Sequence, residues 1–242
     1  MKCIVLAAGY ATRLYPLTKN FPKPLLEVSG KTILDHLLDD INEKGLVDEF
    51  VVVSNHAFYH HFENWAKEKP YKITLLDDGT TSNENRLGAV KDIMFVIEEL
   101  SLSDDLLVIA GDNLLSFSLG EFLDYFKKMD STVIMRYFEK DYESLKKRGV
   151  IEKLEGDRVL GMVEKSPTPP TNWCVPPFYI YKKDDIHLIK EAIESGVNTD
   201  APGSFTAWLT TKTLVNSWEM TGERYDIGDI KSYEKVKEIF KN

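Results

Sequence analysis

The chain has 242 residues, of which 43% are hydrophobic and 29% are charged, and its formal net charge is −9. This length and hydrophobic content suit one large α/β domain with a sizeable core. The acidic balance argues against a nucleic-acid partner, because proteins that bind nucleic acid usually carry a basic face. No apolar stretch approaches 18 residues and no signal-peptide pattern is present. We therefore expect a cytoplasmic protein with no membrane partner.

Strands and helices alternate along the first 138 residues. Short apolar runs predict buried strands, whereas apolar residues three or four positions apart predict helices. The expected strands cover residues 2–6, 50–53, 73–76, 106–110 and 132–137. The expected helices cover residues 32–44, 58–66, 87–100 and 119–129. This alternation is typical of a doubly wound, mainly parallel, Rossmann-like sheet.

The pattern changes after about residue 138. Three further strands are expected at residues 150–154, 159–163 and 178–181, with little helix between them. They predict a small antiparallel extension of the sheet. Helices return at 183–195 and 229–241, and the proline-rich stretch 166–177 is expected to be a loop, because proline removes ladder donors. We expect one domain over residues 1–242, in which residues 1–138 form a first segment and residues 139–242 a second.

A polar loop follows the first predicted strand and runs from Leu6 through Ala7, Ala8 and Gly9 to Arg13. Small residues let backbone amide groups approach a phosphate, and an arginine adds a fixed charge with two parallel donors. The loop matches neither G-x-x-x-x-G-K-(S/T) nor G-x-G-x-x-G. On its own the loop fits a tight turn that carries a surface arginine somewhat better than a phosphate site.

A further motif, Lys23-Pro24-Leu25-Leu26, begins ten residues after Arg13. Together the loop and this motif resemble the opening of the sugar nucleotidylyltransferase family, which includes glucose-1-phosphate thymidylyltransferases and uridylyltransferases. The resemblance continues along nearly the whole chain. It implies an enzyme that joins a nucleoside triphosphate, preferably dTTP or UTP, to a sugar 1-phosphate such as glucose 1-phosphate and releases pyrophosphate. It also implies that residues 1–138 bind the nucleotide and that residues 139–242 bind the acceptor and carry the C-terminal helix.

Two aspartates are candidates for a magnesium site. Asp112 follows the predicted strand 106–110, and a carboxylate at a strand end beside a phosphate loop is a suitable Mg²⁺ ligand. Asp226, in Tyr225-Asp226-Ile227-Gly228, resembles the second carboxylate of the family. The resemblance implies catalytic roles for Arg13, Lys23 and Lys165. The residues expected to contact the nucleotide are Leu6, Ala7, Ala8, Gly9, Arg13, Lys23, Leu87, Gly88 and Asp112.

The acceptor site is expected mainly within residues 139–242. Gly149, Glu164 and Lys165 resemble the family's acceptor site, where a glycine backbone and a glutamate bind sugar hydroxyls and a lysine holds the phosphate. Asn172 and Val175 fall where the family lines its sugar pocket, and Asn113 is expected to contribute as well. The partners implied are therefore a nucleoside triphosphate and a small phosphorylated acceptor.

Three positions depart from the family pattern. Ala11 stands where many members have glycine, and alanine suits that position only where φ is negative. Pro176-Pro177 stands where the family has a small residue followed by glycine. Arg224 stands where tryptophan is common. These departures bear on the identity of the acceptor more than on the type of reaction.

Two other functions remain open from the sequence. The first is a cytidylyltransferase that uses CTP and phosphocholine or a related non-sugar phosphate. The second is a non-catalytic nucleotide-sugar sensor. Such a sensor would not need all five of the charged residues Arg13, Lys23, Asp112, Lys165 and Asp226, so their presence argues against it. The chain lacks the C-terminal segment through which longer thymidylyltransferases form tetramers, so we expect a monomer or homodimer.

Overall fold

The computed structural model describes residues 1–241, which fold into two compact units. We call residues 2–86, 110–120 and 221–242 the amino-terminal unit. The central unit consists of residues 87–109 and 121–220, together with Met1. The two segments expected from the sequence are consecutive, whereas these units interleave along the chain.

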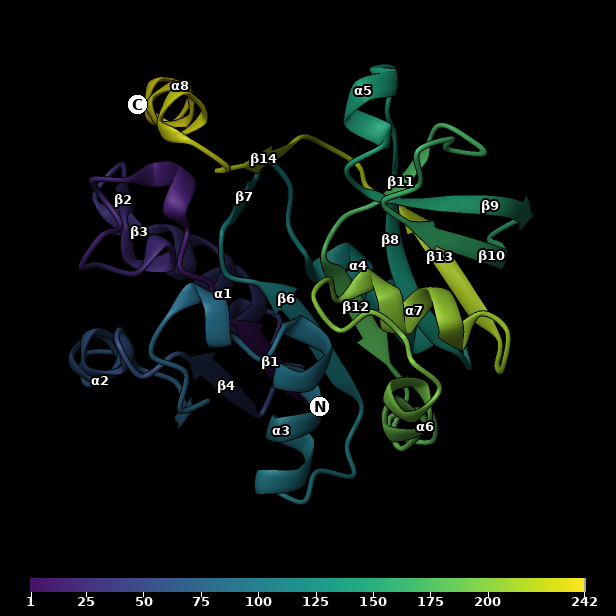
Figure 1. The fold of residues 1–242 in the computed structure, drawn as a ribbon, viewed down its shortest axis with the longest axis horizontal. Helices are drawn as coiled ribbons and strands as arrows, with labels where there is room; N and C mark the ends of the chain where they lie inside the picture. Colours follow the sequence, from purple (N-terminus) through teal and green to yellow (C-terminus); the bar gives the residue numbers. More distant parts are fainter. Residues whose placement is uncertain (242) are drawn as a thin grey trace. The chain divides into compact units, whose positions relative to one another are not determined.

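The amino-terminal unit contains a parallel sheet (Figure 1). Its strands are β1 (Lys2–Leu6), β4 (Glu49–Ser54) and β5 (Ile73–Asp77), with β4 between the other two. Every residue of β4 is buried. Helices α1 (Ile33–Glu43) and α2 (Tyr59–Ala66) connect the strands. The predicted parallel alternation is therefore confirmed in this unit.

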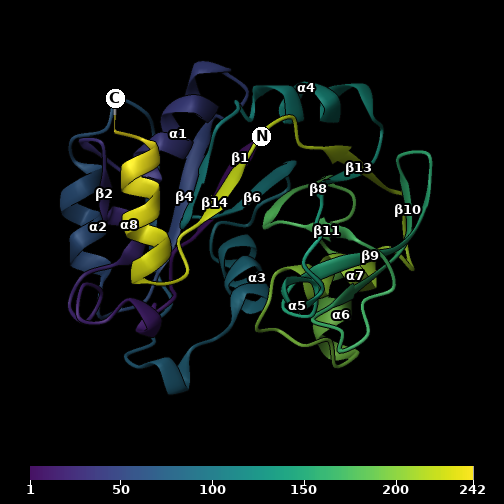
Figure 2. The ribbon, with the colours of Figure 1, turned by 90° about the horizontal axis from the view of Figure 1, so that it is seen from above.

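Several short elements of this unit were not predicted. They are β2 (Glu27–Val28), β3 (Lys31–Thr32), β7 (Asn113–Leu115) and β14 (Arg224–Asp226), with single 3-10 turns at Thr12–Leu14, Lys23–Leu25 and Asn83–Asn85. β7 pairs with β14 in antiparallel register, which places Asp226 opposite Asn113. The predicted C-terminal helix is confirmed as α8 (Ile230–Ile239), which lies beside β2 in Figure 2.

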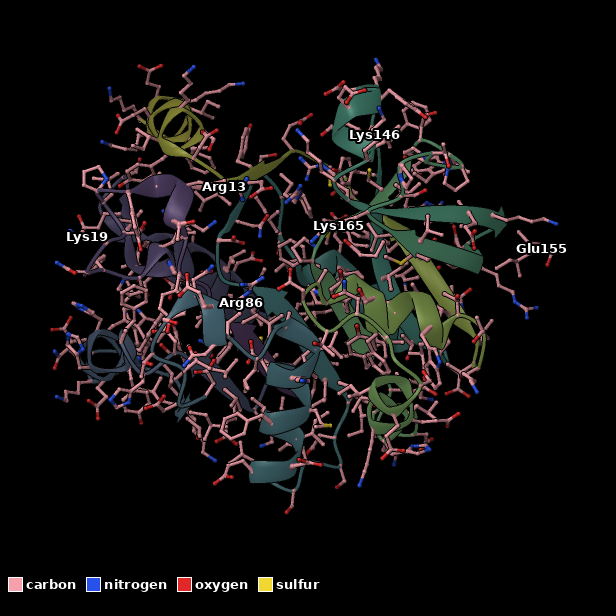
Figure 3. All side chains as sticks on the ribbon, viewed as in Figure 1. Arg13, Lys19, Arg86, Lys146, Glu155 and Lys165 are labelled. Carbon is pink, nitrogen blue, oxygen red and sulfur yellow. The ribbon has the colours of Figure 1, made fainter. Side chains whose placement is uncertain are left out.

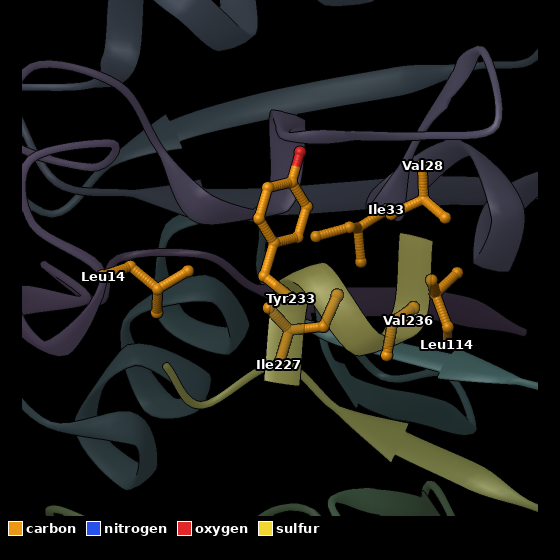
Figure 4. Close-up of a cluster of buried hydrophobic side chains, with 7 residues drawn as sticks. All are labelled: Leu14, Val28, Ile33, Leu114, Ile227, Tyr233 and Val236. Carbon is orange, nitrogen blue, oxygen red and sulfur yellow. The ribbon is translucent and has the colours of Figure 1, made fainter. Parts of the chain in front are cut away.

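One cluster of buried side chains joins these short elements (Figure 4). Its members come from the turn after the phosphate loop, from β2, α1 and β7, and from the segment β14–α8: Leu14, Val28, Ile33, Leu114, Ile227, Tyr233 and Val236. Leu14, Leu114 and Ile227 each adjoin a predicted site residue in sequence. The Tyr233 hydroxyl donates a hydrogen bond to Glu27 O at 2.7 Å. The cluster thus fixes three separate segments of the chain that carry the candidate site.

The central unit contains a mixed sheet (Figure 1). Its strands follow the order β6 (Leu106–Ala110), β12 (Phe178–Tyr181), β8 (Thr132–Phe138), β13 (Val215–Glu219), β10 (Arg158–Glu164), β9 (Gly149–Glu155) and β11 (Trp173–Val175). Within the described residues of this unit, β8 and β13 are parallel and the other pairs are antiparallel.

The predicted antiparallel extension is confirmed for β9, β10 and β12, but the sheet of the central unit is mixed and not mainly parallel. Strand β12, whose four residues are all buried, runs antiparallel to both β6 and β8. An apolar run fixes that a strand is buried on both faces, but it does not fix the direction of that strand. The alternation of strands and helices therefore predicts the strand directions of the amino-terminal unit but not those of the central unit.

The helices of the central unit are α3 (Ala89–Glu99), α4 (Gly120–Lys128), α5 (Tyr142–Leu145), α6 (Leu188–Glu194) and α7 (Gly203–Leu209). The predicted helix 183–195 begins only at Leu188, and α5, α7 and β13 were not predicted. The prediction that residues 166–177 form only a loop is wrong for 173–175, which form β11 immediately before Pro176. No helix within residues 1–241 has the length and apolarity needed to cross a membrane.

Candidate functional site

The loop after β1 offers backbone donors. The Asn55 Nδ2 group donates to Ala8 O at 2.9 Å and the Ala7 N–H donates to Val53 O at 3.0 Å, which ties the loop to β4 and its end. No hydrogen bond within residues 1–241 uses the N–H groups of Ala8 or Gly9. A Cβ placed on the exposed Gly9 would meet no atom within 4 Å. Unpaired amide groups beside the open space at Gly9 suit an anionic ligand.

Ala11 adopts a left-handed backbone conformation, with φ 46° and ψ 42°. This is the conformation in which alanine is disfavoured, because its Cβ approaches the following carbonyl oxygen. The Ala11 carbonyl accepts hydrogen bonds from Thr18 Oγ1 at 2.8 Å and from the Leu14 N–H at 2.9 Å. The buried Thr18, which sequence reasoning missed, therefore helps to hold the strained turn.

Arg13 follows this turn and is exposed (Figure 3). A Cβ placed on Gly228 would lie 3.8 Å from Arg13 Nη1, so the guanidinium lies beside the segment that connects β14 to α8. Hydrogen bonds from Ser232, with a smaller contribution from the Arg13 charge, hold the pKa of Asp229 below its usual value. The loop arginine and the C-terminal segment thus belong to one surface of the amino-terminal unit.

Lys23 is paired with Asp112 inside this unit. Its Nζ lies 2.5 Å from Asp112 Oδ2 and donates to Ile227 O at 2.6 Å, and the lysine side chain is only 10% exposed. Burial by itself raises the pKa of Asp112, but the charges of Lys23 and Arg224 outweigh burial and hold this pKa below its usual value. Asp112 is therefore a carboxylate at neutral pH.

The two predicted metal ligands come from neighbouring backbone positions. Asp226 pairs with Asn113, the residue after Asp112, and the Ile227 N–H donates to Asp112 O at 3.4 Å. The Asp226 side chain is 41% exposed, and its Oδ2 lies 3.8 Å from Arg224 Nη1. No group of three or more His, Cys, Asp or Glu residues within residues 1–241 has the arrangement of a metal site. Asp112 and Asp226 are thus the two carboxylates that this position offers to a metal.

Asn113 was predicted to contact the acceptor, but its side chain is 1% exposed. The Asn113 Nδ2 group donates to Asp112 Oδ1 at 2.7 Å, and Asn113 Oδ1 accepts from Arg224 Nη1 at 2.6 Å. Both ends of the amide are thus engaged inside the protein, between Asp112 and Arg224.

Leu87 and Gly88, which were predicted to contact the base, belong to the central unit. Gly88 has φ 91°, and a Cβ at this position would lie 2.6 Å from Thr199 O. The Val90 N–H donates to the same carbonyl oxygen at 3.0 Å. The contact with Thr199 and the positive φ therefore require glycine at this position.

Three of the predicted acceptor residues lie side by side on adjacent strands of the central unit. Gly149 on β9 pairs with Glu164 on β10 and with Val175 on β11. A Cβ on Gly149 would lie 2.9 Å from Glu164 Oε2. A Cβ on Gly203, at the start of α7, would collide with the same carboxylate oxygen. Two glycines therefore make room for Glu164, and sequence reasoning missed the second one.

The carboxyl group of Glu164 is an unusually weak acid. Burial raises its pKa to about 7, and the adjacent Lys165 charge opposes this effect only in part. Within residues 1–241, no hydrogen bond to the Glu164 side chain is present. Lys165 is exposed (Figure 3), has φ 54°, and its N–H donates to Arg148 O at 3.0 Å. A carboxyl without a partner and an adjacent ammonium together suit a ligand that carries both hydroxyl groups and an anion.

Asn172 is held differently from the other acceptor candidates. Its Nδ2 group donates to Glu139 O at 2.7 Å, and the Glu139 N–H donates to Asn172 O at 2.9 Å. These bonds tie the residue before β11 to the residue after β8. The amide nitrogen of Asn172 therefore has a structural partner.

The sequence is similar to known transferases over its whole length. The family model described as nucleotidyl transferase matches residues 2–242. A relative from Sulfolobus acidocaldarius is 25% identical over 98% of the chain, which spans 62% of that relative's length. The UTP–glucose-1-phosphate uridylyltransferase AglF of Haloferax volcanii is 25% identical over 77% of the chain and 74% of its own length. The choline-phosphate cytidylyltransferase of Streptococcus pneumoniae is 27% identical over 100% of the chain and 99% of its own length.

Solved structures share the fold. A UDP-glucose pyrophosphorylase in complex with UDP-glucose superposes with a TM-score of 0.82 at 21% sequence identity, over 99% of this chain and 97% of the other. At this identity the likeness establishes the fold alone. The mixed sheet described above is thus also the fold of a nucleotide-sugar enzyme.

Proposed function

Because the chain belongs to the nucleotidyl transferase family and is an enzyme of that family, we propose that it transfers a nucleotidyl group to a sugar 1-phosphate and releases pyrophosphate. We favour dTTP or UTP as the donor and glucose 1-phosphate as an acceptor. The observation that carries the proposal is the pair formed by the buried Lys23 and the partly exposed Asp112 next to the backbone of Asp226 and Ile227. A cation for phosphate and carboxylates for a metal are thus assembled in one unit.

Mg²⁺ is the metal that fits this carboxylate set. It binds proteins through one or two carboxylates and completes its octahedron with water and phosphate oxygens. Asp112 and Asp226 supply two carboxylates, and the partial exposure of Asp226 leaves room for the other ligands. We propose that these two residues hold Mg²⁺, which when bound adds positive charge beside the phosphate that is attacked.

The amino-terminal unit would hold the triphosphate. Backbone N–H groups at Ala8 and Gly9, together with the exposed Arg13, are the proposed ligands of the β- and γ-phosphates. Lys23 would neutralise charge on the α-phosphate as the bond to pyrophosphate breaks. Its ammonium is already held by Asp112 and Ile227 O, so it requires little ordering when the nucleotide binds.

The central unit would hold the acceptor. Glu164 is the proposed partner of acceptor hydroxyl groups, with Gly149, Val175 and Asn172 beside it, and Lys165 would hold the acceptor phosphate. In the reaction, a phosphate oxygen of the acceptor attacks the α-phosphorus and the bond to pyrophosphate breaks. A phosphate monoester is largely ionised at neutral pH, so the attack needs no general base. The catalytic contribution of the protein is therefore positioning and charge neutralisation.

A second candidate is transfer from CTP to phosphocholine or a related non-sugar phosphate. It is favoured by the choline-phosphate cytidylyltransferase of Streptococcus pneumoniae, which matches the chain over the full length of both proteins. A cationic acceptor would require Glu164 as a carboxylate, whereas a sugar can also donate to or accept from a neutral carboxyl. The two candidates share the nucleotide site and differ at the acceptor.

A substrate panel tests both candidates. Purified protein with Mg²⁺ is mixed with dTTP, UTP, CTP or GTP and with glucose 1-phosphate, mannose 1-phosphate or phosphocholine, and pyrophosphate release is followed. We expect the fastest release with dTTP or UTP and a sugar 1-phosphate. Fastest release with CTP and phosphocholine would select the second candidate. Nucleotide binding without pyrophosphate release for any pair would contradict both and favour a sensor.

A further inference from the structure

Arg224 is a buried cation behind the proposed metal ligands. Its side chain is only 5% exposed, so it is not presented to a substrate. It belongs to β14, two residues before Asp226, and side chains two positions apart on a strand lie on the same face. The Arg224 Nη1 group lies 3.8 Å from Asp226 Oδ2 and donates to Asn113 Oδ1 at 2.6 Å. One guanidinium nitrogen is therefore close to groups on both β7 and β14.

The hydrogen bond from Arg224 orients the Asn113 amide together with Asp112 and with Ala110 O, which lies 3.4 Å from Asn113 Nδ2. Guanidinium groups only donate hydrogen bonds, so the oxygen of the amide must face Arg224. The amide nitrogen then faces Asp112 and donates to its Oδ1 at 2.7 Å. The reversed amide would direct one oxygen at a carboxylate and one N–H group at a guanidinium, and both contacts would be repulsive. Arg224 thus excludes the reversed orientation.

Both oxygens of Asp112 have donors in this arrangement. Lys23 Nζ lies 2.5 Å from Oδ2, and Asn113 donates to Oδ1. The carboxylate plane is therefore fixed from two sides, one of which depends on Arg224. Groups that orient a metal ligand without touching the metal commonly change metal affinity about 10- to 100-fold when they are removed.

We propose that Arg224 is a positioning residue that orients the Asp112 carboxylate through the amide of Asn113. The role of Asp112 in binding a metal rests on the proposed function, but the orienting role of Arg224 does not. The chain Arg224–Asn113–Asp112 acts before any ligand binds, because it consists of side chains that already contact each other. A structural measurement without ligands therefore tests it separately from activity.

The first experiment compares the wild type with Arg224→Met and Arg224→Gln in metal-free crystals. Methionine is apolar, whereas glutamine can still donate to Asn113 Oδ1 without carrying a charge. We expect the Asn113 amide and the Asp112 carboxylate to turn in Arg224→Met and to keep their positions in Arg224→Gln. Unchanged positions in Arg224→Met would overturn the proposal. If Arg224→Met does not fold, Arg224→Leu with Arg224→Gln gives the same comparison.

The second experiment measures Mn²⁺ affinity by electron paramagnetic resonance, with UTP present and no acceptor. We expect affinity to fall about 10- to 100-fold in Arg224→Met and less than about threefold in Arg224→Gln. Arg224→Met should lower Mn²⁺ affinity less in an Asn113→Ala background than in the wild type, because both changes break the chain to Asp112 and only the contact of Arg224 with Asp226 is separate from it. Additive losses would overturn the proposal.

A matched control separates this role from loss of a buried cation in general. Arg136 is also a largely buried arginine, with an 11% exposed side chain that contacts Asp157 and Ser217 in the central unit. Arg136→Met should lower stability and leave Mn²⁺ affinity unchanged. Equal losses in Arg136→Met and Arg224→Met would contradict positioning. If the wild type releases no pyrophosphate but the crystals show the expected turn, the proposed function fails and the role of Arg224 stands.

Discussion

Lys23 Nζ lies 2.5 Å from Asp112 Oδ2, so the proposed phosphate cation and the proposed metal ligand neutralise each other before any substrate binds. Each charge would be unfavourable alone in a largely buried site. A metal ion on Asp112 and a phosphate on Lys23 would supply each group with a new partner of opposite charge. The pair therefore stabilises the ligand-free protein, and under the proposed function it would also make binding of metal and nucleotide mutually dependent.

Replacing Asp112 by Asn should reduce both turnover and stability. The substitution keeps the shape of the side chain but removes its charge, so Lys23 loses its ionic partner. We expect pyrophosphate release to fall at least about 100-fold. The free energy of unfolding should fall by about 1–3 kcal/mol, because a hydrogen bond to a charged group is lost. The exposed Asp184→Asn is the control for urea unfolding and activity, and equal behaviour of the two variants would contradict the assignment.

Replacing Lys165 by Ala should affect the acceptor more than the nucleotide. The lysine is exposed and adjacent to Glu164, and its charge lowers the pKa of that carboxyl group. We expect the KM for the acceptor to rise about tenfold or more, with little change in the KM for the triphosphate. Both constants are measured by pyrophosphate release with one substrate saturating. The control Lys153→Ala removes an exposed lysine of β9, and a similar rise in both KM values of Lys165→Ala would place its role elsewhere.

Stability should depend on pH through Glu164. The pKa is about 7 in the folded protein and 4.5 in an unperturbed glutamate, so the folded state binds the proton more tightly. Stability contributed by this proton is therefore complete below pH 4.5 and lost as pH rises through about 7. Glu164→Gln should be more stable than the wild type at pH 8 and close to it at pH 4.5. Urea midpoints at both pH values test this, with the exposed Glu155→Gln (Figure 3) as the control.

The sequence predicted the main helices and strands well, because their apolar periodicity is strong. The helical spacing of apolar residues in α1 and the continuous buried run of β4 are the clearest of these patterns. It did not predict β7 and β14, which are three residues each and are defined by their pairing across more than 100 positions. The candidate site depends on this pairing, because it places Asp226 opposite Asn113, the residue that follows Asp112. The position of Asp112 after a predicted strand pointed to it as a metal ligand, whereas Asp226 was found through the family resemblance.

The surroundings of the site were less accessible to sequence reasoning. Asn113 has the same amide whether it faces a ligand or the interior, and only burial shows that it faces Asp112 and Arg224. The role of Gly203 depends on Glu164 from a distant strand, so no local signal marks it. Contacts between distant positions thus explain most of what the sequence left open.

Replacing Ala11 by Gly should leave stability unchanged or raise it by up to about 1 kcal/mol. Alanine at φ 46° costs about 1–2 kcal/mol, and glycine relieves this strain but gains entropy in the unfolded chain. The control Ala207→Gly lies in helix α7 at an ordinary helical position and should lose about 1 kcal/mol. Urea unfolding of both variants tests the difference in sign. A loss in Ala11→Gly as large as that in Ala207→Gly would mean that the left-handed turn carries no strain. Turnover should survive in Ala11→Gly, because the Ala11 carbonyl keeps its bonds from Thr18 and Leu14.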